Sequence, residues 1–264
     1  MADHRATGTV VRATQRNAAP WADDELVIEE PLEIRVEGEP LVVTMRTPGH
    51  DRVLAAGFLY SEGVIDGPDD LSALDHLGGD GGQNVMAVRL ASGVAAHREA
   101  LRRAQREVVA TSACGLCGKT RLDQVEVTAT TPILPTDVDE AILAGLPGRL
   151  HSLQPVFRRT GGLHGATLMT PTGELAPPFE DIGRHNAVDK VLGARLLADQ
   201  VPVDDRFLVV SGRAGFEIVQ KARVAGVPAV IAFGAASSLA VELAERSSMR
   251  LYGFVRDDRW TRYA

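Results

Sequence analysis

The second half of the chain alternates short apolar runs with helical patterns, and this alternation limits the possible folds more than any other feature. Runs that read as buried strands lie at 207–210, 229–233 and 251–255. Amphipathic patterns that read as helices lie at 185–199, 216–225 and 237–246. Strands that are apolar on both faces and alternate with helices are typical of a parallel sheet covered on both sides. We therefore predict a parallel α/β layer with helices on both faces.

Two further patterns precede this alternation. A helical pattern runs over 137–157, and two short strands flank the turn residues Pro171, Thr172 and Gly173, which is a hairpin signal. Both patterns belong to the half of the chain that carries the α/β layer. We assign 136–264 to one α/β domain.

The first half is richer in strands. Strand patterns lie at 26–28, 32–36, 41–45, 84–90 and 125–130, and helical patterns lie at 51–60 and 97–110. Pro132 and Pro135 mark a boundary after them. We predict a smaller strand-rich α+β portion over 1–135.

Composition narrows the classes of protein. With 264 residues, 45% of them hydrophobic, the chain is long enough to bury a large core. It has no run of ~20 apolar residues that would span a membrane, and 1–5 lack the apolar core of a signal peptide, so we expect a cytoplasmic protein without a membrane partner. A net charge of −7 argues against nucleic-acid binding.

Small residues, hydroxyls and arginines follow the three predicted parallel strands. Ser211, Gly212 and Arg213 follow the first strand, the sequence Gly-Ala-Ala-Ser-Ser at 234–238 follows the second, and Arg256 and Arg259 follow the third. Ligands of such sheets bind beyond the carboxyl ends of the strands, where helix N-termini and arginines receive phosphate. The turns indicate a nucleotide or pyrophosphate site, although the same residues also serve as ordinary helix caps.

A charged cluster at 180–190 enters the predicted helix of the second half. Its histidine, His185, could bind an anion or act in acid–base catalysis. In the structural alternative, Asp181 caps the helix and His185 lies in its first turn without a catalytic role. In the same alternative, Asp189 and Lys190 lie on the solvent face of the helix. His164 reads as the lead-in to a strand.

The only two cysteines, Cys114 and Cys117, form a CxxC pair flanked by glycines in a break after a charged helix. Such a pair can hold zinc, form a disulfide, or hand sulfur to another molecule. Zinc would need two further ligands, and a thioredoxin-like redox motif would follow a strand and open a helix. These alternatives stay open on spacing alone.

Three segments together resemble a known family. They are Ala-Cys-Gly-Leu-Cys-Gly at 113–118, Phe-Leu-Tyr-Ser-Glu-Gly-Val-Ile at 58–65 and Glu-Asp-Ile-Gly-Arg-His-Asn-Ala-Val-Asp-Lys at 180–190. With Ser-Gly-Arg at 211–213 and Gly-Phe-Val-Arg at 253–256, they resemble the FdhD family of formate dehydrogenase accessory sulfurtransferases.

The resemblance implies a homodimeric sulfur carrier with a cytidine deaminase-like α/β fold. Such a carrier takes sulfur from a cysteine desulfurase and passes it to the molybdenum cofactor, as Mo-bis(molybdopterin guanine dinucleotide), before formate dehydrogenase receives that cofactor. The persulfide maps onto Cys114, with Cys117 as its neighbour, and no resident metal is expected. The family's cofactor-binding segment maps onto Phe254, Val255, Arg256, Asp257, Asp258 and Arg259, to which the turn analysis adds Gly212 and Arg213. The alternative is a nucleotide-binding chaperone or scaffold whose CxxC holds zinc or a disulfide.

Overall fold

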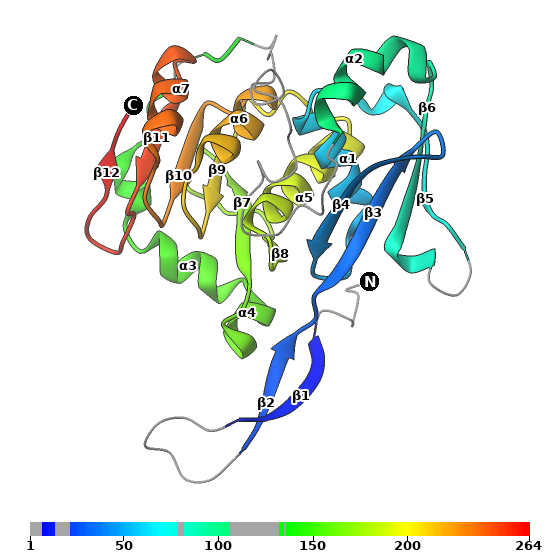
Figure 1. Ribbon diagram of the computed structural model, residues 1–264. Coiled ribbons are helices and arrows are strands. Elements are labelled where there is room, and N and C mark those ends of the chain that lie inside the picture. Colours follow the sequence, from blue (N-terminus) through cyan, green and yellow to red (C-terminus); the bar gives the residue numbers. More distant parts are fainter. Residues whose placement is uncertain (1–6, 14–21, 79–81, 106–131, 135) are drawn as a thin grey trace.

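The computed structural model describes residues 7–13, 22–78, 82–105, 132–134 and 136–264. The described residues form a six-stranded sheet, a four-stranded sheet and a two-stranded ribbon, with helices packed between and around the two larger sheets (Figure 1). The predicted α/β class is confirmed. The likeness to cytidine deaminases stays a prediction, as does the domain boundary at 135.

The six-stranded sheet has the order β12-β11-β10-β9-β7-β8. Its bounds are β7 His164–Met169, β8 Phe179–Asp181, β9 Phe207–Val210, β10 Ala229–Ala232, β11 Arg250–Gly253 and β12 Thr261–Arg262. Strands β9, β10 and β11 are parallel, as predicted, but β7, β8 and β12 are antiparallel to their neighbours. The prediction of a purely parallel sheet was therefore wrong at both edges, where short connections return the chain beside the strand it has just left.

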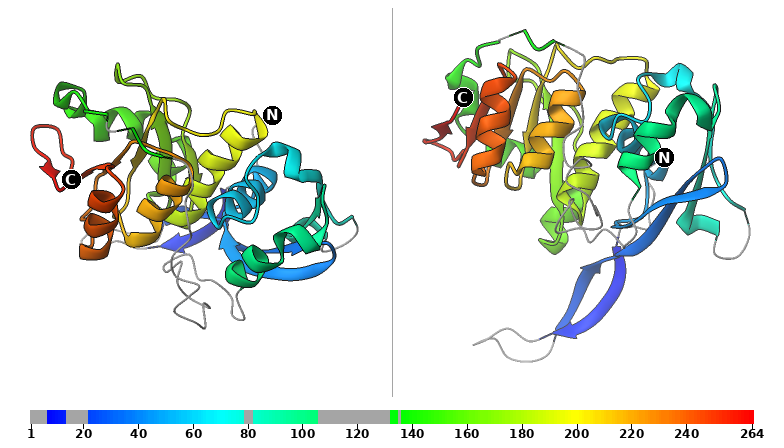
Figure 2. Two further views of the ribbon diagram at one scale, coloured as in Figure 1. Left: turned by 90° about the horizontal axis from the view of Figure 1, so that it is seen from above. Right: turned by 45° about the horizontal axis from the view of Figure 1, so that its top comes forward.

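Alternate residues of the central strands face two different layers. Leu208, Val210 and Val230 belong to the core on one face, and Val209 and Ile231 belong to the core on the other. Helices α5 Arg184–Leu197, α6 Phe216–Val224 and α7 Ser238–Arg246 cover the first face, and α3 Leu146–Ser152 lies on the second (Figure 2). This double covering explains why these strands are apolar throughout.

The helix expected over 137–157 is broken into three pieces. They are the 3-10 turn η4 Glu140–Leu143, helix α3, and helix α4 Pro155–Thr160. Gly145 has a left-handed backbone with φ 65°, and Pro147 and Pro155 stand in the first turns of α3 and α4. Proline fits the first turn of a helix and interrupts a longer one, so the prediction of one helix was wrong.

The four-stranded sheet has the order β4-β3-β6-β5 and packs on helix α1 Asp51–Ser61. Its bounds are β3 Glu30–Val36, β4 Glu39–Arg46, β5 Leu71–His76 and β6 Val85–Leu90. Glu37 and Gly38 connect β3 to β4 with φ 52° and 91°, the positive values that a tight hairpin turn requires. The 3-10 turns η1 Pro68–Asp70 and η2 Gly82–Asn84 precede β5 and β6.

Other parts of the first half differ from the prediction or lie beyond the description. Helix α2 spans Val94–Ala104, where 97–110 was predicted, and the strand predicted at 125–130 lies outside the described residues. Strands β1 Thr7–Ala13 and β2 Ala22–Val27 form the ribbon, which projects from the body at the bottom of Figure 1. Of the strands in this half, β1 and β5 were not predicted.

Helices α1 and α5 join the two halves at very short range. A Cβ atom added to Gly57 would lie 1.8 Å from the Asp189 carbonyl oxygen, and one added to Gly193 would lie 1.9 Å from the Val53 carbonyl oxygen. Only glycine permits this approach. One continuous core runs from β3 through α1 and α5 to β9. The motif at 58–65 is thereby held against the motif at 180–190.

Candidate functional site

A cavity of about 480 Å³ opens at the carboxyl ends of β9 and β10. Its wall combines three arginines and two histidines with small residues and one aromatic ring: Pro147, His151, His164, Arg184, Ser211, Gly212, Arg213, Phe233, Gly234 and Arg256. The size is that of an ordinary small-molecule site. We call this cavity the arginine pocket.

Strand direction explains how distant residues meet at this pocket. Gly212, Gly234 and Arg256 follow the parallel strands β9, β10 and β11, whose carboxyl ends share one edge of the sheet. Strand β7 runs antiparallel to β9, so its first residue, His164, lies at the same edge. Arg184 reaches the pocket as the first residue of α5.

The loops that line the pocket are bonded to one another. The Gly234 amide donates to the Gly212 carbonyl at 2.9 Å, and the Ala214 amide donates to the Ala235 carbonyl at 3.0 Å. A Cβ atom on Gly234 would lie 2.9 Å from the Arg213 Cα, so this position requires glycine. These contacts continue the parallel pairing past the ends of the strands and fix the backbone beneath a ligand.

The electrostatic character of the pocket favours anions. Arg184, Arg213 and Arg256 all border it, and α5 and α6 begin beside it at Gly183 and Gly215, neither of which supplies a capping side chain. Helix N-termini and guanidinium groups both attract phosphate. Burial first, and then the charges of Arg184 and Arg213, lower the pKa of His164, so its imidazole is neutral near pH 7.

The expected cofactor-binding segment, 254–259, lies next to the arginine pocket and lines a second cavity that shares Arg256 with it. This second cavity of about 300 Å³ is lined by Phe254, Arg256, Arg259, Trp260 and Thr261. Arg256 borders both cavities, and its Nη1 donates to the carbonyls of Phe233 and Val255. The structure therefore places Arg256 with Gly212 and Arg213 at one site and Phe254 and Arg259 beside it.

The other members of that segment have different surroundings. Val255 is fully buried in the core beneath β11 and lines neither cavity. Asp257 and Asp258 are exposed and line neither cavity, and the Asp257 carbonyl accepts a hydrogen bond from the Gly145 amide at 3.2 Å. Their predicted contact with a cofactor stays a prediction. Cys114 and Cys117 lie outside the described residues.

The two motifs that flank the α1–α5 contact form a buried charged cluster. Lys221 Nζ lies 2.9 Å from Asp189 Oδ1 and 2.8 Å from Ser61 Oγ, and the Ser61 hydroxyl donates to Asp189 Oδ1 at 2.7 Å. Glu62 is 3.8 Å from Lys221. Burial raises the pKa of Asp189, and Lys221 and Ser61 oppose that rise.

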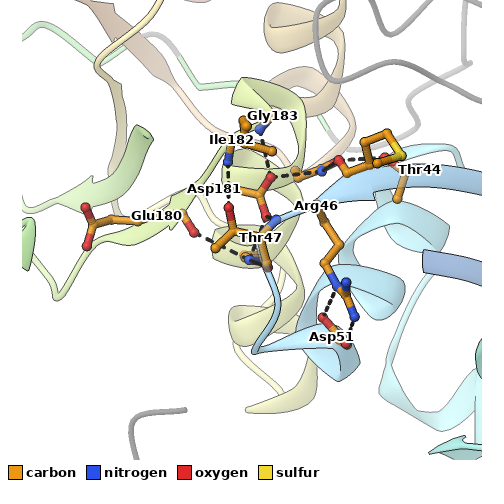
Figure 3. Close-up of polar contacts among 11 residues, drawn as sticks. Thr44, Arg46, Thr47, Asp51, Glu180, Asp181, Ile182 and Gly183 are labelled. Atoms are coloured by element: carbon orange, nitrogen blue, oxygen red, sulfur yellow. Dashed lines mark hydrogen bonds and ion pairs between the residues drawn. The ribbon is translucent and has the colours of Figure 1, made fainter. Parts of the chain in front are cut away.

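A second buried cluster surrounds Asp181 (Figure 3). Its carboxylate accepts from the amides of Thr47 and Gly183 at 3.2 and 2.8 Å and pairs with Lys190 at 2.7 Å. Asn186 donates to the same carboxylate at 3.0 Å. In the same figure, Arg46 binds Asp51 through two hydrogen bonds, at the start of α1.

These clusters correct the interpretation of the 180–190 cluster as a solvated helix face. Asp189 and Lys190 are 2% and 1% exposed, because α1 and the 44–47 strand end cover them. The prediction that Asp181 caps the helix was wrong, because the N-cap residue of α5 is Gly183 and no side chain caps it. The Asp181 carboxylate accepts from the Gly183 amide in the turn before the helix and ties that turn to the first half through the Thr47 amide. Two of the partners of Asp189 and Lys190, Ser61 and Thr47, lie more than a hundred residues away in the sequence, so no local pattern indicated the burial.

His185 does not line the arginine pocket. Its Nε2 lies 3.0 Å from Glu217 Oε2, and the imidazole is almost fully buried. Burial lowers the pKa of His185, and the hydrogen bond to Glu217 opposes that effect. His164, interpreted from sequence only as the lead-in to a strand, instead lines the pocket. The signal for it was the hairpin, since an antiparallel strand starts where its parallel neighbours end.

No three His, Cys, Asp or Glu side chains within the described ranges gather as a metal-binding group. No helix in that part of the chain combines the length and the hydropathy needed to cross a bilayer.

Comparisons with known proteins agree with the motifs. The family model described as "FdhD/NarQ family" matches residues 27–264. "Sulfur carrier protein FdhD" of Streptomyces avermitilis is 50% identical over 249 residues, covering 91% of this chain and 87% of the relative. The protein of the same name from Anaeromyxobacter dehalogenans is 45% identical over 266 residues, covering 97% and 92%.

A solved structure shares the fold. The "Crystal structure of a putative formate dehydrogenase accessory protein from Desulfotalea psychrophila" is similar with a TM-score of 0.70 and 22% sequence identity, covering 96% of this chain and 94% of that one. The family model and the sequence relatives span nearly the whole chain, including the motifs that build both buried clusters and the arginine pocket. The chain therefore belongs to the FdhD/NarQ family.

Proposed function

We propose that this protein is a sulfur carrier of the cytoplasm, acting as a homodimer. It takes sulfane sulfur from a cysteine desulfurase and passes it to Mo-bis(molybdopterin guanine dinucleotide) before that cofactor enters formate dehydrogenase. The observation that carries the proposal is the arginine pocket in a chain whose relatives are named sulfur carrier proteins. The similar structure from Desulfotalea psychrophila, described as a putative formate dehydrogenase accessory protein, points to the same enzyme.

The residues present fit the dinucleotide ends of this substrate. The chain has a net charge of −7, yet three arginines gather at one pocket. This local positive charge suits a small ligand such as a diphosphate better than a large anionic partner. Gly212 and Gly234 allow close approach of the backbone to phosphate oxygens. Phe254 and Trp260 offer aromatic faces in the adjoining cavity, where a purine base would stack.

In the sulfur step, the Cys114 thiolate attacks the outer sulfur of the donor's persulfide. A bond forms between Cys114 Sγ and that sulfur, the donor's S–S bond breaks, and the donor cysteine leaves as a thiolate. The exchange is redox-neutral. The sulfur then resides on Cys114 as a persulfide, ready for a second transfer.

Cys117 provides a competing route. If its thiolate attacks Cys114 Sγ, hydrosulfide leaves and a Cys114–Cys117 disulfide forms, so the sulfane sulfur is reduced while the two thiols are oxidised. Delivery prevails when the acceptor is held close to the persulfide, because proximity replaces a bimolecular encounter by a local one.

Mass spectrometry after incubation with a desulfurase and cysteine tests the proposal. We expect an adduct of one sulfur atom, about 32 Da, on the wild type and on Cys117→Ala, and none on Cys114→Ala. The adduct on Cys117→Ala would persist longer, because its self-quenching route is gone. Stoichiometric zinc without any adduct would instead support a nucleotide-binding scaffold whose CxxC holds metal.

Calorimetry with GDP tests the acceptor site separately. We expect Arg213→Ala and Arg256→Ala each to weaken GDP binding by about tenfold or more, because each removes a charge-assisted hydrogen bond. Arg206→Ala is the matched control, since Arg206 stands just before the opposite end of β9, paired with Asp205. Equal affinity in all four proteins would rule out the pocket as the nucleotide site.

A further inference from the structure

His164 occupies an unusual place for a histidine. It borders the arginine pocket at the start of β7, and a Cβ atom on Gly212 would lie 3.4 Å from its Nδ1, so the ring rests against the loop that follows β9. Among the described residues, none is hydrogen-bonded to this ring. Its nitrogens therefore face the pocket without a competing partner in the described part of the chain.

The titratable and charged groups around His164 come from five parts of the chain. Arg184 and His185 belong to α5, Arg213 to the loop after β9, and Asp181 to β8, which pairs with β7 at His164 itself. Across the same pocket stand His151 of α3 and Arg256 after β11. Asp181 is the one anion of the set, and it is already paired with Lys190.

We propose that His164 takes up a proton when a diphosphate binds in the arginine pocket, and that the imidazolium then contacts the bound anion. The inference rests on the proposed function for the identity of the ligand, a nucleoside diphosphate end. It adds a residue that binds the ligand only in one protonation state, and hence a dependence of binding on pH.

The balance of charges supports this coupling. The empty pocket repels a fourth positive charge, because His164 is half-buried beside Arg184 and Arg213. A diphosphate brings two to three negative charges among the same groups and reverses the sign of the local potential. Protonation then becomes favourable, and the imidazole gains a charge-assisted hydrogen bond to a phosphate oxygen.

Linkage fixes the direction of the pH dependence. Binding raises the pKa of His164, so affinity is greatest below the pKa of the free protein and falls as pH rises towards the pKa of the complex. Since burial and the neighbouring arginines hold the pKa of His164 in the free protein below that of an ordinary histidine, the fall in affinity begins below the ordinary histidine range and ends at the higher pKa of the complex. Within that window, one linked proton changes the association constant by about tenfold per pH unit.

The test is calorimetry of GDP and of inorganic pyrophosphate in buffers of different ionisation enthalpy, between about pH 6 and pH 8. The terminal phosphate of GDP titrates in this range as well, so the informative quantity is the difference between the wild type and His164→Gln. We expect the wild type to take up more protons per ligand, by as much as one near the middle of the window, and to show a steeper loss of affinity. His97→Gln, which alters a histidine bonded to the Val64 carbonyl far from the pocket, should match the wild type.

A second measurement uses the unaltered protein. The carbon-bound ring protons of His164, followed by NMR, should titrate at a higher pH in the presence of GDP than in its absence. Equal proton uptake by wild type and His164→Gln, or an unchanged NMR titration, would overturn the role of His164 while leaving a GDP site intact. If pyrophosphate bound with proton uptake and GDP did not bind, the inference would stand and the proposed nucleotide would be wrong. If neither ligand bound, both would be wrong.

Discussion

Replacing Lys221 by methionine tests the buried cluster that holds the two halves together. The Lys221 and Asp189 side chains are 5% and 3% exposed and lie 2.9 Å apart. Methionine keeps the length of the apolar stem, so the substitution removes the charge and leaves little cavity. What remains is a buried Asp189 carboxylate with the Ser61 hydroxyl as its hydrogen-bond donor at 2.7 Å.

The expected loss of unfolding free energy is about 3–5 kcal/mol at pH 7, because breaking a buried ion pair leaves an uncompensated charge. Protonation limits the loss. Burial already raises the pKa of Asp189, and removing Lys221 takes away the main opposing influence, so the pKa rises further. Each unit by which it then exceeds its unfolded value costs about 1.4 kcal/mol once the pH is above both.

The sign of the pH effect follows from this rise. A carboxyl group with a folded pKa above its unfolded pKa binds a proton on folding, so the variant loses stability as pH rises from the unfolded value towards the folded one. Lys221→Met should therefore recover stability relative to the wild type as pH falls from about 7 towards about 5. A surface charge would show no such recovery.

Urea unfolding at several pH values measures the effect. Arg206→Met, which removes a partly exposed charge at the surface, should change the free energy of unfolding by less than about 0.5 kcal/mol. The double variant Asp189→Asn/Lys221→Met should regain about 2 kcal/mol or more over Lys221→Met, since a neutral amide needs no counter-ion. A loss that is independent of pH, or a double variant no more stable than the single one, would refute the reasoning.

Two further substitutions probe local packing by the same unfolding measurement. Gly193→Ala should lower the free energy of unfolding by about 1–3 kcal/mol, because its Cβ would lie 1.9 Å from the Val53 carbonyl oxygen and α1 would have to move away. Gly148→Ala is the control: it lies in an exposed helical position with open space around it, so it should be neutral or stabilising. Ser237→Ala should cost about 1 kcal/mol, because the Ser237 side chain accepts a hydrogen bond from the Ala240 amide at the start of α7; no loss there would mean that water caps the helix equally well.

The parts of the fold that the sequence predicted well are those with a strong local signal. The run Phe207–Val210 is apolar on both faces and became β9 at the predicted residues, and α6 begins at Phe216 as predicted. The prediction of one helix over 137–157 was wrong because it relied on the apolar spacing alone. Gly145, Pro147 and Pro155 divide this stretch into separate short helices.

The residues of the candidate site also divide into those that the sequence predicted and those that it did not. Gly212, Arg213 and Arg256 meet because the carboxyl ends of parallel strands share one edge of the sheet. This meeting could be predicted, because it depends only on the order of strands and turns along the sequence. His164 was missed because its strand is antiparallel, and Arg184 because its cluster was interpreted as a helix entry. The burial of Asp189 and Lys190 depends on α1 lying across α5, which no pattern within 180–190 encodes.

The shared buried clusters also have a consequence during synthesis. Ser61 is made 128 residues before its partner Asp189, which at the usual speed of translation is an interval of roughly 10 s. Throughout that time, the face of α1 that packs against α5 has no folded partner, although the four-stranded sheet of the first half can already cover the other face. We expect the nascent chain to expose that face until α5 emerges, which makes it a target for chaperones at the ribosome.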